Sequence, residues 1–405
     1  MTNTEGGTQQ KRGAPEGHRA GDSFAIPGSH TDTAIEKTGT PSVGPIGPVW
    51  PDVRRIAVLR GGGLGDLLFA MPAIDALAAA YPDAELVLLG TRLHAALLDE
   101  RPGPVRRVHL LPPATGVYEP KGREPDEIEQ EKFFREVARE PVDLAAQLHG
   151  GGRWSNGFLH RLDPKWTVGS RTEDAAPMSR WLPYRFYQHE MMRALEIVGL
   201  AGAPPVHLEA RIALTASDLE AAEEPLRGLP EPLLAVHPGA TDLRRQWPSE
   251  RFAEVAAKCA EEGAGVVVIG SPGERELVAE VTELTRQRLP GTAAGAVRGH
   301  ADLSLSALCG VLARSGVLIG NDSGPRHLAK ALGTPTVGIF WMGNVINAGP
   351  LGRLHDRVLI AWTATCPVCG VDCTREDLPR CEHNVSFVSS VSTEDALREV
   401  VELIS

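Results

Sequence analysis

Short apolar strands alternate with amphipathic helices along most of this chain, and the alternation starts twice. The first series begins with the strand-like run at residues 54–60, and the second begins with the run at 233–237. A Pro-rich connection at residues 201–231 separates the two series. Strands that alternate with helices form open, mostly parallel sheets covered by helices on both faces. We therefore expect an α/β fold with two such sheets.

The chain divides into three regions. Gly, Pro, Ser and Thr dominate residues 1–51, and the few apolar side chains there are isolated. Such a segment buries too little surface to offset its ordering entropy, so we expect a disordered extension. We predict an N-terminal domain at 52–207 and a C-terminal domain at 208–405, the latter with a cysteine cluster and a terminal helix. A length of 405 residues is typical of two domains.

Composition excludes several classes of protein. The net charge of −11 and the pI of about 5.7 argue against a nucleic-acid-binding protein, although a cationic pocket for a phosphorylated small molecule remains compatible with them. No apolar run is long enough to span a membrane, and no signal peptide is evident. We therefore expect a cytoplasmic protein with at most peripheral membrane contact. Six cysteines are few for a disulfide scaffold of this length.

The first strand ends in the loop Gly61–Asp66, which suggests the dinucleotide fingerprint G-x-G-x-x-G. Asp66 replaces its last glycine, and a carboxylate there would sit where a pyrophosphate should lie. A nicotinamide site is therefore disfavoured. Asp66 could simply cap the following helix. Alternatively, it could face a ligand at the carboxyl edge of the sheet and act as a general base.

Two segments in the second half suit an anionic ligand. Arg244 and Arg245 follow a glycine turn at the end of a strand, where they could bind an anion or form a solvated basic loop. Further on, Asp322, Ser323 and Gly324 join a strand to a helix. The unpaired N–H groups of such a helix start suit a diphosphate, unless Asp322 or Ser323 caps the helix.

Two further signals are less specific. Glu274 and Glu276 follow a strand end, where one of them could accept hydrogen bonds from ribose hydroxyls or remain exposed on the surface. Four cysteines near the C-terminus could bind structural zinc, but their spacing is irregular for a zinc site. An iron–sulfur cluster and reduced thiols stay open as alternatives. The four residues are Cys366, Cys369, Cys373 and Cys381.

Four motifs, taken in this order, resemble glycosyltransferase family 9, the ADP-heptose:lipopolysaccharide heptosyltransferase family. They are GGGLGDLLFAMPAIDAL, HPGA…RRQWP, IGSPGERE and NDSGPRHLAKALGTPTVGIF. The resemblance covers roughly residues 53–404. It implies a GT-B fold, in which two Rossmann-like domains place the active site between them. It also implies an inverting, metal-independent transfer of a sugar from a nucleotide diphosphate.

The resemblance assigns a role to each matching residue. Asp66 would be the general base, and Arg245, where the family usually has Lys, would contact the donor phosphate. Glu274 would bind the ribose, and Ser323 with Gly324 would form the phosphate cradle. The remaining donor-side residues would be His237, Arg244, Asp322 and His327. The acceptor-side residues would be Gly63, His149, Asn156 and His189.

The resemblance also implies the partners. The donor would be a nucleotide-diphosphate sugar such as ADP-heptose, and the acceptor would be a glycan or glycolipid. Cysteine clusters near the C-terminus also occur among relatives. The N-terminal extension and the acidic segment at 120–140 are not part of the family core, so donor and acceptor could differ from those of the lipopolysaccharide enzymes. A nucleotide-sugar epimerase of the same fold and an inactive nucleotide-sugar-binding protein are the alternatives.

Overall fold

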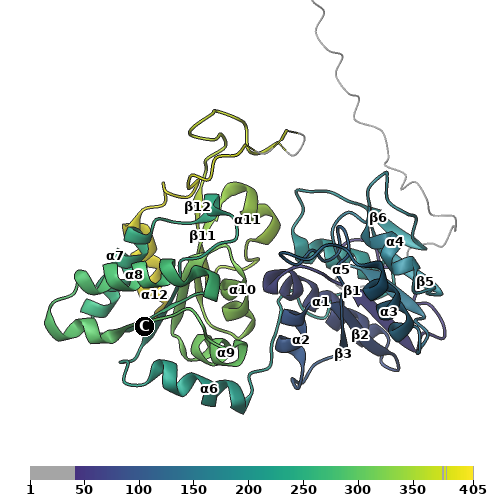
Figure 1. Ribbon diagram of the computed structural model, residues 1–405, viewed down its shortest axis with the longest axis horizontal. Coiled ribbons are helices and arrows are strands. Elements are labelled where there is room, and N and C mark those ends of the chain that lie inside the picture. The colour runs from purple at the N-terminus through teal and green to yellow at the C-terminus, as the bar shows by residue number, and fades with distance from the viewer. Residues whose placement is uncertain (1–41, 376–377, 380, 405) are drawn as a thin grey trace, which may run out of the picture. The chain divides into compact units, whose positions relative to one another are not determined.

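The computed structural model describes residues 42–375, 378–379 and 381–404 (Figure 1). Most of the expected disordered extension lies outside these residues, but its last part packs on the first domain. Trp50 is 7% exposed and stacks on Trp166, with 5.4 Å between the ring centroids. The Trp50 N–H donates to the Tyr81 hydroxyl at 3.1 Å. The packed chain therefore begins before residue 52, because the stack on Trp166 and the hydrogen bond to Tyr81 anchor the segment that ends at Trp50.

The first half contains a six-stranded sheet in the order β3-β2-β1-β4-β5-β6, in which every neighbouring pair is parallel. Its strands are β1 (Arg55–Leu59), β2 (Glu85–Gly90), β3 (Val105–Leu110), β4 (Leu144–Gln147), β5 (Trp166–Arg171) and β6 (Arg180–Pro183). All five residues of β1 are buried, as expected for a central strand covered on both faces. The parallel sheet is confirmed, and β6 is a strand that the sequence did not reveal.

Helices cover both faces of this sheet. They are α1 (Leu64–Ala80), α2 (Arg92–Leu98), α3 (Glu127–Val137), α4 (Ser155–His160) and α5 (Glu190–Gly199). Helices α1 and α5 pack against each other on one face, and the apolar side chains of α3 and α4 join those of the other face. Helix α3 lies in the acidic segment where an amphipathic helix was expected, with Phe133 and Val137 buried.

The second half repeats the arrangement with the strand order β12-β11-β10-β7-β8-β9, again with parallel neighbours. Its strands are β7 (Leu233–His237), β8 (Gly265–Ile269), β9 (Val297–His300), β10 (Val317–Asn321), β11 (Thr336–Trp341) and β12 (Asp356–Ala361). The sequence did not reveal β9 or β12. Strand β9 has only four residues and two of them are charged or polar, which masks its pattern.

Helices also alternate with the strands of the second half. They are α6 (Ala216–Leu226), α7 (Ser249–Glu261), α8 (Arg275–Gln287), α9 (Leu305–Arg314), α10 (Gly324–Ala331), α11 (Met342–Ala348) and α12 (Thr393–Ile404). Short 3₁₀ turns lie at η1 (Leu243–Arg245), η2 (Pro272–Glu274) and η3 (Gly291–Ala296). The expected terminal helix is α12, which packs on α7 with Ala396 and Val400 buried.

The two halves contact each other through α1 and α10, and their apolar side chains belong to one continuous core cluster. A buried ion pair adds to this contact, because Arg101 donates to both oxygens of Asp218 at 2.6 and 2.7 Å. In the part of the chain that the structure describes, none of the helices combines the length and apolarity that crossing a membrane requires.

Candidate active site

Helix α1 begins immediately after the loop that follows β1, and Asp66 lies in its first turn. One Asp66 oxygen accepts the Gly63 N–H at 2.8 Å, so the residue does cap the helix. The other oxygen accepts a hydrogen bond from the Arg60 guanidinium at 2.8 Å. The Asp66 side chain is nevertheless 47% exposed, so a ligand can reach the carboxylate. Capping and an accessible carboxylate are therefore compatible at this position.

Arg60 fixes the orientation of that carboxylate. Its side chain is buried at the end of β1, and its Nη1 donates to the Leu148 carbonyl. Its Nη2 also lies 3.5 Å from a Glu190 oxygen at the start of α5. A guanidinium held on three sides has little rotational freedom, so the Asp66 oxygen that it contacts is held as well.

His149 lies beside this ion pair, in the loop between β4 and α4. Burial, with the positive charge of Arg60, lowers the pKa of His149 to about 4. The ring is therefore neutral near pH 7 and adds no positive charge next to Asp66.

The other acceptor-side candidates occupy different environments. Asn156 is fully buried, and its amide donates to the carbonyls of Ser170 and Ala176, so it supports the surrounding loops. The His189 ring lies 2.7 Å from the Gly349 carbonyl in the second half of the chain, and burial lowers its pKa. His189 therefore belongs to the contact between the halves.

Helix α10 begins without a side-chain cap. Ser323 occupies the N-cap position but accepts no hydrogen bond from the first turn, and its hydroxyl lies 2.9 Å from His237 Nδ1 instead. Asp322 does not cap the helix either. The capping interpretation of these two residues is therefore wrong, because both side chains are engaged elsewhere. Pro325 has no N–H, so the N–H groups that the uncapped start of α10 offers to an anion are those of Gly324 and Arg326.

Asp322 holds the neighbouring side chains in place rather than facing a ligand. It is 5% exposed, accepts from Arg245 at 3.2 Å and Asn344 at 3.0 Å, and lies 3.0 Å from His327 Nε2. Burial alone would raise the pKa of Asp322, but the His327 contact and the nearby arginines bring its pKa below the usual value. We expected Asp322 to bind the donor, and its burial makes it a positioning residue for Arg245.

The two arginines of the second half differ in their partners. Arg244 makes a fork of hydrogen bonds to Asp242, which caps the same short turn, and this contact raises the pKa of Arg244. Arg245 contacts Asp322 through one nitrogen, at 3.2 Å. Asn321 holds the loop that carries both arginines by accepting the Trp247 N–H at 3.0 Å.

Glu274 lies at the end of β8, against the end of β7. Its carboxylate accepts from the N–H and the hydroxyl of Ser271 at 2.8 and 2.7 Å and lies 3.7 Å from His237 Nε2. The neighbouring His237 ring is the main cause that lowers the pKa of Glu274 to about 2, and the Ser271 donors add to this effect. Glu274 is therefore an ionised acceptor at the sheet edge.

The starts of α1 and α10 lie directly against each other. A Cβ atom on Gly324 would stand 3.2 Å from the Leu64 Cβ and 3.7 Å from the Gly65 nitrogen. On the next turn the Phe69 ring meets the His327 ring edge-on, with 4.6 Å between the centroids. Because neither glycine carries a side chain, the first turn of α1, which carries Asp66, packs directly on the first turn of α10.

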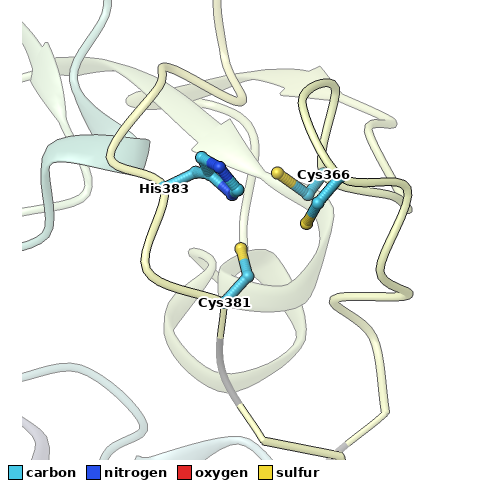
Figure 2. A group of neighbouring side chains, drawn as sticks. Cys366, Cys381 and His383 are labelled. Atoms are coloured by element: carbon cyan, nitrogen blue, oxygen red, sulfur yellow. The ribbon is translucent and has the colours of Figure 1, made fainter.

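The cysteines do not group as the sequence suggested. Cys366, Cys369, Cys381 and His383 bring one potential ligand atom each to within 4.8 Å of one another. Figure 2 shows the thiols of Cys366 and Cys381 and the ring of His383 directed toward a common centre. The predicted fourth ligand, Cys373, is replaced in this group by His383.

Sequence reasoning missed Arg60, Asn321, Asn344 and His383 at these sites. Arg60 was visible as a basic residue at the end of a strand, directly before the glycine loop. Asn344 and His383 gave no signal, because they reach their partners from segments with no recognisable pattern.

The comparisons with known proteins bear on this arrangement. The sequence profile of glycosyltransferase family 9 (heptosyltransferase) matches residues 167–370, slightly more than half of the chain. The chain belongs to glycosyltransferase family 9. It is thus a glycosyltransferase, as the resemblance implied. The matched range includes all donor-side candidates from His237 to His327, whereas Asp66 lies outside it.

Relatives of the family extend over most of the chain. Lipopolysaccharide core heptosyltransferase OpsX of Haemophilus influenzae is 22% identical over 76% of this chain and 84% of that protein. A glycosyl transferase family 9 structure from Veillonella parvula has a TM-score of 0.67 and 21% identity, with 87% and 97% of the two chains covered. E. coli heptosyltransferase WaaC with ADP-2-deoxy-2-fluoro heptose has a TM-score of 0.59 and 18% identity, with 86% and 99% covered. These structures confirm the predicted GT-B fold.

Proposed function

We propose that the protein transfers a heptose-type sugar from a nucleotide diphosphate, ADP-heptose or a close analogue, to a hydroxyl of a glycan or glycolipid. The juxtaposition of Asp66 at the start of α1 with the uncapped start of α10 carries this proposal. The names of OpsX and of WaaC with its bound ADP-sugar analogue support the choice of lipopolysaccharide core and ADP-heptose.

The donor would lie on the second half of the chain. Its diphosphate would accept hydrogen bonds from the N–H groups of Gly324 and Arg326, and Arg245 would provide a positive charge beside them. Glu274 would accept hydrogen bonds from the ribose hydroxyls at the neighbouring strand end. Donor binding is thus assigned to residues 208–405 and acceptor binding to residues 52–207.

Transfer would proceed with inversion at the anomeric carbon. Asp66 accepts the proton of the acceptor hydroxyl as that oxygen forms its bond to the anomeric carbon. The bond between this carbon and the diphosphate oxygen breaks on the opposite face, and the nucleoside diphosphate leaves with the electron pair. Arg60 holds Asp66 in position but contacts neither substrate.

Positive groups of the protein would balance the charge that grows on the leaving diphosphate. Both groups are preorganised, since Asp322 holds the Arg245 guanidinium and the helix backbone holds the α10 N–H groups. We infer that the transfer needs no divalent metal. Equal rates in buffers with and without added Mg²⁺ would support this inference, and a requirement for Mg²⁺ would contradict it. We place the reaction in the cytoplasm, where the nucleotide sugar would be available.

A thermal-shift panel of ADP-, GDP-, UDP- and dTDP-sugars tests the donor assignment. A ligand that binds only the folded state stabilises it more the lower its Kd at a given concentration, so ADP-heptose should raise the melting temperature most. The Arg245→Ala variant is the matched control and should show a smaller shift at the same concentration. An assay of ADP release, together with analysis of the nucleotide sugar, then separates the activities. ADP release that depends on the acceptor supports transfer, ADP release without acceptor would indicate a hydrolase, and conversion of the donor into another nucleotide sugar would indicate an epimerase.

A further inference from the structure

The loop between β12 and α12 contains a group of side chains that sugar transfer does not use. Cys366, Cys369, Cys381 and His383 bring three thiols and one imidazole together, with all four potential ligand atoms within 4.8 Å. The six cysteines of the chain are free thiols. Clustered thiols and an imidazole are a donor set that soft and borderline metal ions prefer.

The backbone around the first two cysteines is shaped for such a site. The Cys366 N–H donates to the Val371 carbonyl at 2.8 Å, and the Gly370 N–H donates to the Cys366 carbonyl at 2.9 Å. Gly370 has a φ of 72°, a conformation that a residue with a side chain rarely adopts. The chain thereby reverses direction just after Cys369, which keeps both thiols on the same side of the turn.

His383 provides a second and independent indication of a ligand. Its Nδ1 atom is buried and has no hydrogen-bond partner among the described residues. A buried ring nitrogen without a partner is unfavourable unless something else binds it. In Figure 2 the ring faces the thiols of Cys366 and Cys381, which is where a bound ion would lie.

We propose that Cys366, Cys369, Cys381 and His383 bind one structural zinc ion. Tetrahedral zinc with bonds of about 2.0–2.3 Å holds its ligand atoms about 3.5–3.8 Å apart, so the observed group needs to contract only slightly. Four protein ligands close the coordination sphere, which suits a structural ion and leaves no position for a substrate. Cys373 is not a ligand, and its thiol donates instead to the Val371 carbonyl at 3.4 Å.

The zinc ion joins two segments that flank the donor side of the active site. After the second ligand pair, the Ser386 hydroxyl donates to the Gln246 carbonyl at 2.6 Å and the Phe387 N–H donates to the Arg244 carbonyl at 2.7 Å. After the first pair, Asp372 and Cys373 line a cavity of about 220 Å³ together with Arg244. The ion therefore fixes the wall of this cavity.

Metal analysis of the full-length protein, purified under reducing conditions without chelators, tests the proposal. We expect one zinc ion per folded chain, and refilling of the stripped protein by zinc alone. His383→Ala and Cys381→Ser should lose the ion. Cys373→Ser is the matched control from the same loop and should retain it. Cobalt bound in place of zinc should show the visible absorption of a tetrahedral thiolate site.

Three results would overturn the proposal. A folded wild-type chain that binds no zinc after reconstitution would show that these four residues do not form a zinc site. Loss of zinc in Cys373→Ser but not in His383→Ala would show that the fourth ligand is the Cys373 thiolate and not the His383 imidazole. Visible absorption typical of an iron–sulfur cluster in the purified protein would show that the cysteines hold such a cluster and not a zinc ion. Zinc content is measured without any sugar transfer, so this proposal and the proposed function fail separately.

Discussion

The Arg60 guanidinium donates to an Asp66 oxygen at 2.8 Å, from a position at the end of β1 where the arginine is almost completely buried. The same carboxylate caps α1 through the Gly63 N–H. Two fixed donors on one exposed carboxylate leave few orientations for it. The base of the proposed reaction is therefore held by the first half of the chain alone, before any substrate arrives.

Replacing Arg60 should slow transfer without weakening donor binding. In Arg60→Gln the carboxylate loses one fixed partner, and misplacement of a catalytic group costs up to about 10²-fold in rate. We expect kcat to fall roughly 10- to 100-fold while the donor KM holds, and Arg60→Lys to recover part of the loss. Steady-state kinetics measures this. Arg54→Gln, at the exposed start of the same strand, is the control and should be neutral; an equal loss in both variants would argue against positioning.

Arg245→Ala should weaken donor binding. A hydrogen bond to a charged group contributes about 1.5–3 kcal/mol, so calorimetry should show a roughly 10- to 150-fold higher Kd for the nucleoside diphosphate. Arg245→Lys should recover much of this loss, because a lysine retains the charge. Arg244 is occupied by Asp242, so Arg244→Ala should affect the Kd less. An unchanged Kd in Arg245→Ala would show that Arg245 does not contact the donor phosphate and that another residue does.

Gly324→Ala should disturb the junction of α1 and α10. The added Cβ would stand 3.2 Å from the Leu64 Cβ, so a neighbour must move. Overpacking of this kind lowers the free energy of unfolding by about 1–3 kcal/mol, which denaturant unfolding of Gly324→Ala should measure. Gly157→Ala is the matched control, because a Cβ at Gly157 meets no atom within 4 Å. Equal free energies of unfolding for the two variants would contradict the close approach of α1 and α10 at Gly324.

Burial of His149 should make the protein less stable in acid. Its pKa of about 4 in the folded chain lies below the ordinary value of 6.5, so between these pH values only the unfolded chain binds the proton. Stability therefore falls as the pH drops from about 6.5 to about 4, by up to about 3 kcal/mol for this residue. Denaturant unfolding at several pH values should show a flatter profile for His149→Gln. Parallel profiles for the two proteins would refute this.

The regular elements could be predicted because their patterns are local. The strand before Gly61 is a continuous apolar run and the helix after it is apolar on almost all faces, and the alternation of such strands with helices predicts both parallel sheets. The start of α10 was recognisable for the same reason, since Asp322, Ser323 and Gly324 stand between a strand and a helix. A site at a strand–helix junction can be found from one segment of the chain.

The rest depends on contacts between distant segments. The sequence could not show that Asp322 is buried against Arg245, or that Ser323 turns to His237 rather than capping α10. It also could not show that His383, rather than Cys373, joins the other cysteines, because the fold of the loop decides which side chains meet. Nor could it show that Trp50 stacks on Trp166, because the two residues are far apart in the sequence.

The central claim is that Asp66 is the catalytic base, and the Asp66→Asn variant tests it most directly. Asp66 stands at the third position of α1 and accepts the Gly63 N–H, which an asparagine amide oxygen can also accept, but an amide cannot take up the proton as a carboxylate does. In single-turnover measurements, with chemistry shown to limit the rate, we predict that transfer falls by roughly 10²- to 10⁴-fold. The melting temperature and the donor Kd should stay near those of the wild type. A folded Asp66→Asn enzyme that transfers sugar at the wild-type rate would contradict the account.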